Sequence, residues 1–279
     1  KVEEQSRKYD NFFPSLALSF PLGKVQMQLA YRGSIKRPSY WDLRGNITYA
    51  NRYTYETGNP LLQPTTIQSL SLNTIYRWMS LSLSYNHYKN DYTSYVRAYS
   101  EENPTIGLLT REHIAPYNRL SASLTLSPVI GKWSPRWGVQ VQRYDCKVDT
   151  PQGVETFDNP RAILSWRNTV KFTDSFWINA DAYYQTKSQI DNTEYLENSW
   201  YMNLNLYKGF MNDRMSLQLQ VSDLFNTRKS HVLMYSGLRT MELDNEMRRT
   251  VSLTFRYKFN PTKSKYKGTG AGQSQKARM

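Results

Sequence analysis

Met215-Ser216-Leu217-Gln218-Leu219-Gln220-Val221-Ser222 alternates strictly between apolar and polar side chains. Successive side chains of an extended chain point to opposite faces of a sheet, so this segment has one apolar face and one polar face. The polar face carries only serine and glutamine, which are neutral and suit a packed polar interior. The stretch therefore predicts a strand with lipid on one side and a polar lumen on the other.

The same alternation recurs along the chain, for example from Val25 to Tyr31 and from Met79 to Tyr85. Most of these segments have about the 9 to 11 residues with which a tilted strand crosses a bilayer. We expect about eleven strands, at residues 12–20, 24–33, 66–76, 79–89, 117–127, 137–146, 161–172, 175–186, 198–207, 214–225 and 248–259. The predicted fold is all-β, an antiparallel transmembrane β-barrel.

The composition agrees with this fold although the mean hydropathy is low. The longest apolar run, Val232 to Tyr235, is far too short for a transmembrane helix of about 20 residues. Aromatic residues make up 14% of the chain, which excludes a disordered polar polymer. Since a barrel strand turns only every second side chain to lipid, a polar average is compatible with membrane insertion.

The connections between the expected strands alternate between short and long. The short ones are residues 21–24, 77–78, 128–136, 173–174 and 208–213, and the long ones are 34–65, 90–116, 147–160, 187–197 and 226–247. Outer-membrane barrels have short periplasmic turns and long extracellular loops. The pattern therefore predicts that the long loops lie outside the cell.

Aromatic residues gather near both ends of the expected strands. They are Phe20, Tyr76, Trp78, Trp133, Trp137, Phe172, Phe176, Tyr207, Phe210, Tyr257 and Phe259 near the short turns, and Tyr31, Tyr85, Tyr117, Tyr144, Tyr184, Trp200 and Phe225 near the long loops. Two such bands match the interfacial girdles of a membrane barrel. Ordinary aromatic residues at sheet edges are the alternative.

The charge and the reactive side chains exclude other classes. The net charge is +13, but the basic residues cluster only in the last part of the chain, so we expect a solvated tail and no nucleic-acid partner. Cys146 is the only cysteine, so a thiolate cluster cannot form. The three histidines lie far apart in sequence, and we expect no metal site and no cofactor.

A hydrolase in the barrel wall would need a serine beside His87 on the same face. Ser82 and Ser84 have the opposite parity and so point to the other face. We therefore expect no catalytic residues and no enzyme activity.

Ligand-binding candidates lie in the loop of residues 34–65. They are Tyr40, Trp41, Arg52, Tyr53 and Tyr55, four rings and a guanidinium that can hold a ligand by stacking and hydrogen bonds. The alternative, that these residues pack the loop onto the barrel rim, stays open.

Three parts of the chain resemble TonB-dependent receptors of Bacteroidetes-type bacteria. They are Arg37-Pro38-Ser39-Tyr40-Trp41-Asp42-Leu43 with Gly58-Asn59-Pro60-Leu61-Leu62-Gln63-Pro64, then Val221-Ser222-Asp223-Leu224-Phe225-Asn226-Thr227, and last Leu253-Thr254-Phe255-Arg256-Tyr257-Lys258-Phe259-Asn260 with Lys265-Tyr266-Lys267-Gly268-Thr269-Gly270-Ala271-Gly272. The motifs occur in the order found in that family.

The resemblance implies a 22-stranded barrel around an N-terminal plug, which imports a ligand when an inner-membrane TonB complex supplies energy. Residues 1–259 would be the C-terminal half of this barrel, and residues 260–279 a basic, glycine-containing periplasmic tail. The expected partners are the outer-membrane bilayer, the plug and remaining strands, the TonB complex through the part not present here, and a small ligand of unknown identity. A passive channel or structural outer-membrane protein is the alternative, and a barrel hydrolase is a third.

Overall fold

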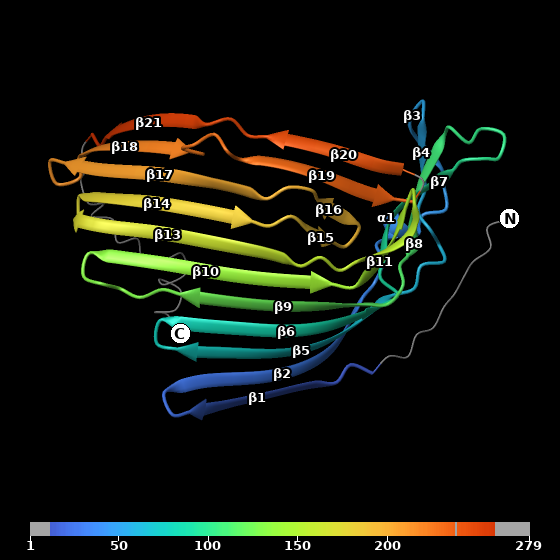
Figure 1. Cartoon of the computed structure of the whole chain (residues 1–279), viewed down its shortest axis with the longest axis horizontal. Helices are drawn as coiled ribbons and strands as arrows, with labels where there is room; N and C mark the ends of the chain where they lie inside the picture. The colour runs from blue at the N-terminus through green and yellow to red at the C-terminus, as the bar shows by residue number, and fades with distance from the viewer. Residues whose placement is uncertain (1–11, 238, 260–279) are drawn as a thin grey trace, which may run out of the picture.

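A computed structural model describes residues 12–237 and 239–259. Its main element is one antiparallel sheet of eleven strands between a short-turn end and a long-loop end (Figure 1). In the order in which they pair, the strands are β1 (Ser15–Leu22), β2 (Val25–Lys36), β5 (Thr65–Tyr76), β6 (Met79–Lys89), β9 (Tyr117–Leu126), β10 (Trp133–Tyr144), β13 (Arg161–Thr173), β14 (Phe176–Gln185), β17 (Ser199–Phe210), β18 (Met215–Ser222) and β21 (Thr250–Tyr257). All eleven expected strands are confirmed.

The strand limits lie close to the predicted ones, with one clear exception. β10 begins at Trp133 rather than at residue 137, and it lengthens the predicted strand toward the short-turn end. Pro135, between Trp133 and Trp137, interrupts the series of large apolar side chains on this face. Trp133 and Trp137 nevertheless share one face, with their ring centroids 6.0 Å apart.

The register of the sheet puts like side chains in rows. Leu18 lies opposite Leu29, which lies opposite Leu72, and Leu72 in turn lies opposite Leu83. Such rows form a continuous apolar belt across neighbouring strands. Its exposed leucines, valines and aromatic rings are the surface that lipid covers in a barrel.

The other face of the sheet is polar. Gln28, Asn73, Ser82 and Ser123 form one row, in which the Ser82 hydroxyl donates to Asn73 Oδ1 at 2.8 Å. This hydrogen bond pairs two polar side chains across neighbouring strands. The predicted alternation of lipid-facing and lumen-facing side chains is confirmed.

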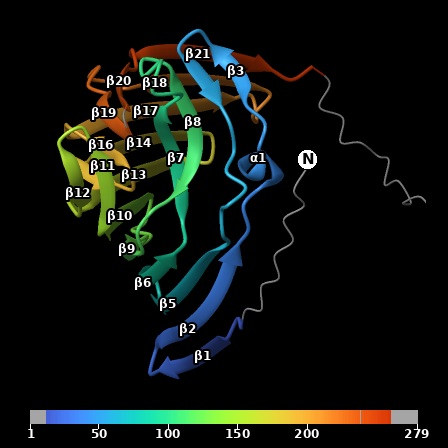
Figure 2. The ribbon, with the colours of Figure 1, turned by 90° about the vertical axis from the view of Figure 1, so that its right-hand side faces the viewer.

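The sheet curls strongly, and β1 and β21 lie at opposite ends of the curve (Figure 2). Within the part of the chain that the structure describes, neither strand pairs along its outer edge, so the barrel is open. Every residue of both strands is exposed. Unpaired edges are not tolerated in lipid, because their main-chain groups find no hydrogen-bond partners there.

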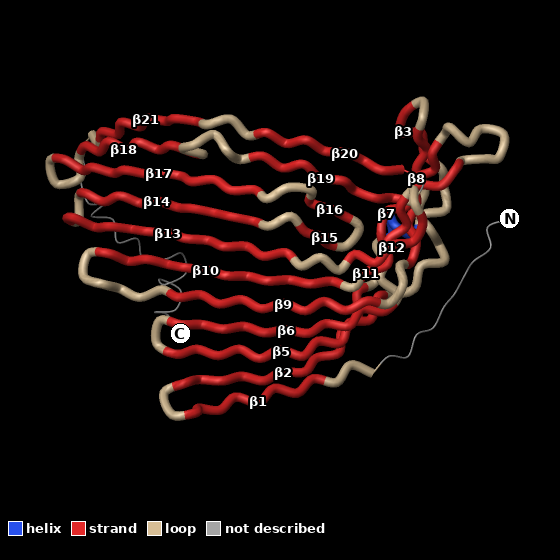
Figure 3. Tube along the Cα trace, in the orientation of Figure 1, coloured by secondary structure: helices blue, strands red, loops and turns tan. Residues whose placement is uncertain are grey.

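The long loops contain ten short strands and a helix that the alternation did not predict (Figure 3). They are α1 (Tyr40–Leu43), β3 (Thr48–Asn51), β4 (Thr54–Glu56), β7 (Tyr92–Ala98), β8 (Gly107–His113), β11 (Cys146–Thr150), β12 (Gly153–Phe157), β15 (Ser188–Ile190), β16 (Thr193–Tyr195), β19 (Lys229–Ser236) and β20 (Arg239–Glu246). The strands form a β3-β4-β8-β7 sheet, a β15-β16-β19-β20 sheet and a β11-β12 hairpin. No helix among the described residues is long and apolar enough to cross a membrane.

Three rings assigned to the girdles point to the polar face instead, so that prediction was wrong for them. Tyr117 lies opposite Tyr88 and stacks on it with the centroids 4.7 Å apart, and Tyr144 stacks on Tyr117 at 6.3 Å. Tyr207 stacks in the same way on Trp177 at 5.3 Å. Proximity to a strand end does not set the face of a side chain, whereas parity along the strand does.

Candidate functional site at the long-loop end

The long loops fold into one layer of structure over the end of the barrel wall (Figures 1 and 2). We call residues 37–64, 90–116, 145–160, 186–198 and 223–249, without residue 238, the loop assembly. Because its strands pair between different loops, the assembly holds side chains from distant parts of the sequence in fixed positions. In β4 and β8, for example, Tyr55 lies opposite Leu108 in a parallel pair.

Asp42 anchors the first loop to the second. Its side chain accepts a hydrogen bond from Arg111 Nε at 2.9 Å and one from the Tyr92 hydroxyl at 3.2 Å. Ser39 caps α1, because its hydroxyl accepts from the main-chain N–H of Asp42 while the Asp42 carboxylate accepts from Ser39. Burial would raise the pKa of Asp42, but the hydrogen bonds from Ser39, Arg111 and Tyr92 outweigh it and lower the pKa to about 2.

Gly58 and Asn59 belong to the second part of the first-loop motif, residues 58–64, and they contact α1 in its first part. A side chain on Gly58 would collide with the main-chain oxygen of Asp42 and come within 2.7 Å of the main chain of Arg44. Asn59 N donates to the Asp42 oxygen at 2.6 Å, and the Thr110 hydroxyl donates to the Gly58 oxygen at 3.2 Å. These motif residues therefore build the loop fold.

Four of the predicted ligand residues are exposed, and the fifth is used in packing. Tyr40 is 95% exposed, Trp41 is 65% exposed and Tyr53 is 53% exposed. The Arg52 guanidinium lies 4.7 Å from the centre of the Tyr53 ring, so the structure brings these two together. Tyr55 is half-buried and stacks on Tyr99 with the centroids 4.7 Å apart.

Trp41 has a cationic neighbour that the sequence did not single out. The Arg44 guanidinium lies over its ring at 3.5 Å and also contacts Glu56 at 3.4 Å. Only 10% of the Arg44 side chain stays exposed, while Trp41 keeps an exposed face. The short separation of Trp41 and Arg44 in sequence was the available signal, because Trp41 lies on α1 and Arg44 follows it directly.

Arg239 joins three separated segments of the loop assembly. Its guanidinium donates to the main-chain oxygens of Tyr53 at 3.0 Å and Thr105 at 3.1 Å, and to the Thr54 hydroxyl at 3.2 Å. Beside it, the Ser236 hydroxyl donates to the Ser94 oxygen at 2.9 Å. The last long loop is therefore fastened to the first two.

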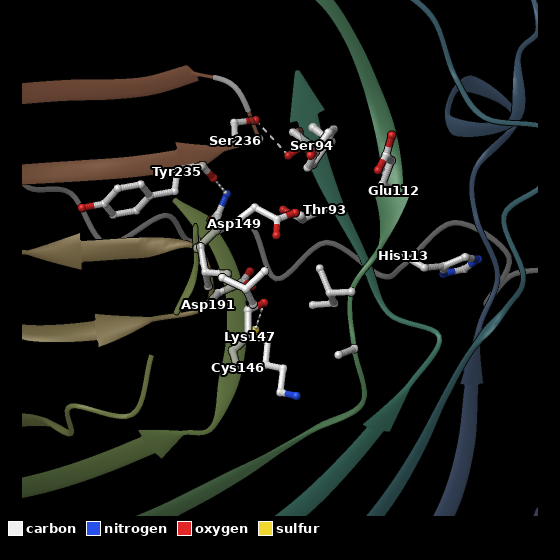
Figure 4. A pocket seen from close by; sticks show the side chains of 17 residues that line it. Thr93, Ser94, Glu112, His113, Cys146, Lys147, Asp149, Asp191, Tyr235 and Ser236 are labelled. Carbon is white, nitrogen blue, oxygen red and sulfur yellow. Dashed lines mark hydrogen bonds between the residues drawn. The ribbon is translucent and has the colours of Figure 1, made fainter. Parts of the chain in front are cut away.

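A cavity of about 190 Å³ lies where four of the loops meet (Figure 4). Three carboxylates line it, those of Glu112, Asp149 and Asp191, together with the thiol of Cys146. Burial raises the pKa of Asp191, and the negative charge of Asp91 raises it further. Burial also raises the pKa of Cys146 to about 12, so the thiol stays protonated and is not a nucleophile.

This cavity is smaller than the roughly 300 to 1,000 Å³ of pockets that hold drug-sized ligands. Its lining comes from strand ends and turns that hold the loops together, as the Ser236 to Ser94 hydrogen bond shows. It is therefore too small for a bulky molecule.

A larger hollow of about 290 Å³ lies between the interior wall and the last loop. Tyr183 and Tyr201 stack across β14 and β17 with the centroids 5.1 Å apart, and the Arg228 guanidinium lies 4.5 Å from the Tyr201 ring. Stacked rings beside a guanidinium can hold a planar or anionic group. Sequence reasoning missed these residues, although parity along the strands would have placed both tyrosines on the polar face.

The serines near His87 lie on the opposite face of β6, as expected. His87 Nδ1 contacts Asn118 Oδ1 at 2.8 Å on the apolar face, whereas Ser82 contacts Asn73 on the polar face. The wall therefore does not bring His87 and Ser82 together.

The comparisons with known proteins agree with the fold. A family model described as the outer membrane protein beta-barrel family matches residues 1–257. The chain belongs to this family, and the protein is therefore located in the outer membrane of a Gram-negative bacterium. No curated protein sequence matches the chain.

Several solved outer-membrane receptors share this fold. A mutant of the ferric enterobactin receptor PfeA of Pseudomonas aeruginosa, solved with enterobactin, is 18% identical with a TM-score of 0.55, and the match covers 88% of this chain and 40% of that one. The siderophore receptor PirA of the same species is 16% identical, with a TM-score of 0.57 and coverage of 78% and 39%. Its pyoverdine receptor FpvA, solved with pyoverdine, is 15% identical, with a TM-score of 0.56 and coverage of 88% and 36%.

The chain thus spans between 36% and 40% of the length of these three receptors. The family match and these neighbours confirm the predicted resemblance to TonB-dependent receptors. The Bacteroidetes-type origin stays a prediction.

Proposed function

We propose that the chain forms part of the barrel wall and the extracellular loops of a TonB-dependent receptor that imports a bulky ligand. The observation that carries this proposal is the loop assembly, in which Arg239, Asp42 and Ser236 fasten loops that are far apart in sequence. A passive pore does not need its long loops joined into an ordered layer, whereas a receptor needs a fixed surface to recognise its ligand.

In this proposal the long loops face the outside of the cell and the short turns face the periplasm. Residues 1–259 are the C-terminal part of the barrel, and further strands and a plug complete it. The edges of β1 and β21 support this, because neither has a partner strand on its outer side among the described residues. Residues 260–279 lie outside the described residues, and their periplasmic position is part of the proposal.

In this proposal, exposed aromatic rings and guanidinium groups at the long-loop end bind the ligand. Tyr40, Trp41, Arg52 and Tyr53 present such groups on the surface, and Tyr55 supports them by packing. Ferric siderophores are the first ligand class to test, because the similar structures were solved as siderophore receptors.

The test is uptake of radiolabelled ferric enterobactin by cells that carry the full-length protein as their only receptor of this kind. We expect uptake that stops when an uncoupler removes the proton gradient. Uptake that continues with the uncoupler, together with steady conductance in planar bilayers, would instead support a passive channel. The proposal includes no enzyme activity, in keeping with the separation of His87 from Ser82 and Ser84.

A further inference from the structure

The hairpin of β19 and β20 carries three potential metal ligands on one face. His231 lies directly opposite Asp244, and Glu242 lies opposite Leu233, two residues further along β19. Residues two apart on a strand point to the same side, so these three side chains converge. His231 Nε2 lies 2.7 Å from Glu242 Oε1 and 3.8 Å from Asp244 Oδ1.

The spacing fits a single bound ion. The ligand atoms of the three residues all lie within 4.8 Å of one another, as they do when each is about 2 Å from a common centre. Within residues 12–237 and 239–259, this is the one group of three or more histidine, cysteine or acidic side chains with that spacing. We propose that His231, Glu242 and Asp244 form a site for a divalent transition metal of the Zn²⁺ class.

The charges around the cluster favour a cation. Two carboxylates so close together repel each other unless a positive charge lies between them. Lys229, two residues before His231 on β19, already pairs with Glu246 at 3.0 Å. A divalent ion would neutralise both carboxylates at once.

The donor set selects the kind of ion. An imidazole nitrogen suits Zn²⁺, Cu²⁺ and Ni²⁺, whereas Ca²⁺ and Mg²⁺ prefer oxygen ligands alone. Three protein ligands leave positions open for water, and the exposed carboxylates of Glu242 and Asp244 make the site accessible from solution. His231 is half-buried and borders the 290 Å³ hollow described above.

The ion would connect the two strands of the hairpin whose far end carries Arg239. Arg239 connects this hairpin to the first two long loops. A metal ion bound by β19 and β20 would therefore make the connection between the three loops more rigid. The site does not depend on which ligand the receptor imports. It departs from the expectation of no metal site, because the sequence did not show that residues 231 and 244 lie opposite each other.

The test is equilibrium dialysis of the full-length protein in detergent, with Zn²⁺ alone and, separately, Ca²⁺ alone. We expect one saturable Zn²⁺ per chain. His231→Asn should weaken Zn²⁺ binding by at least about tenfold, the lower end of the loss seen when even an outer-sphere partner of a metal site is removed. Zn²⁺ should also slow hydrogen exchange in β19 and β20.

Glu101→Gln is the control, because it removes one exposed carboxylate from another loop and leaves the pair of Lys229 with Glu246 in place, and it should leave Zn²⁺ binding unchanged. Glu242→Gln and Asp244→Asn, both at exposed positions, provide the same test if His231→Asn disturbs the hairpin. The absence of stoichiometric Zn²⁺ binding, or binding that these three variants do not weaken, would overturn the proposal. Equal binding of Ca²⁺ that is insensitive to His231→Asn would also overturn it.

Discussion

Arg239 Nη2 donates a hydrogen bond to the main-chain oxygen of Tyr53 at 3.0 Å, across a sequence separation of 186 residues. The same nitrogen donates to Thr105 at 3.1 Å. One side chain thus connects the last long loop to the first and second. Gly107 permits this approach, because an added Cβ would lie only 2.8 Å from the Arg239 guanidinium carbon.

Arg239→Ala should loosen the loop assembly without unfolding the barrel. Hydrogen bonds from a charged donor contribute about 1.5 to 3 kcal/mol each when they are buried, and these partly exposed ones contribute less. We expect faster hydrogen exchange in β3, β4 and β8, and unchanged exchange in the eleven wall strands. Arg97→Ala, an exposed arginine on β7, is the matched control, and equal effects of both changes would contradict this role of Arg239.

Gly58→Ala should destabilise the first loop. Its added methyl group would collide with the main chain at Asp42 and Arg44, which is rigid, so the loop must shift at a cost of about 1 to 3 kcal/mol. Gly45→Ala is the control in the same loop, because its Cβ would meet only Pro60 at 3.7 Å, an ordinary contact. Limited proteolysis of the folded receptor should cut the Gly58 variant faster. Equal cutting rates would show that the motif glycine is not needed for packing.

The anchor at Asp42 should weaken in acid. Its pKa is about 2 in the folded protein and near 3.8 without its partners, so its contribution to stability is complete above about pH 4. That contribution is lost as the pH falls toward 2, because protonation removes the charge that Arg111 contacts. Hydrogen exchange of β8 in wild type and Asp42→Asn should therefore differ at pH 5 and converge near pH 2. A difference that does not change with pH would contradict this assignment.

The wall of the barrel was predictable from sequence, because each strand carries its own period-two signal. Leu219 and Gln220 show it plainly, and the register places them on the two expected faces. The loop assembly was not predictable in this way. Its short strands, such as β4 and β16, pair with segments far away in sequence, and pairs such as Tyr55 with Leu108 leave no local pattern.

Leu219→Arg should prevent stable insertion into a bilayer. Leu219 lies in the apolar row between Leu206 and Leu253, and a charge on the lipid face costs about 2 to 4 kcal/mol near the bilayer centre. Gln220→Arg is the matched change on the polar face and should be tolerated. Folding of the full-length protein into lipid vesicles, followed by resistance to heat in detergent, distinguishes the two. The opposite order of stability would reverse the assignment of the faces.

Variants of Tyr40 and Tyr55 should show whether the aromatic residues of the first loop bind the ligand or pack the loop. Tyr40 is almost fully exposed, so Tyr40→Ala should leave the loop fold unchanged and lower ligand uptake if this surface binds the ligand. Tyr55 stacks on Tyr99, so Tyr55→Ala should lose about 1 kcal/mol of ring pairing and loosen the loop whether or not a ligand is present. Uptake of labelled ferric siderophore and protease resistance, measured on both variants, provide the comparison. Unchanged uptake in Tyr40→Ala, Trp41→Ala and Arg52→Ala would assign these residues to the loop surface alone. The ligand site would then be expected at Tyr183 and Tyr201 on the interior wall, beside Arg228.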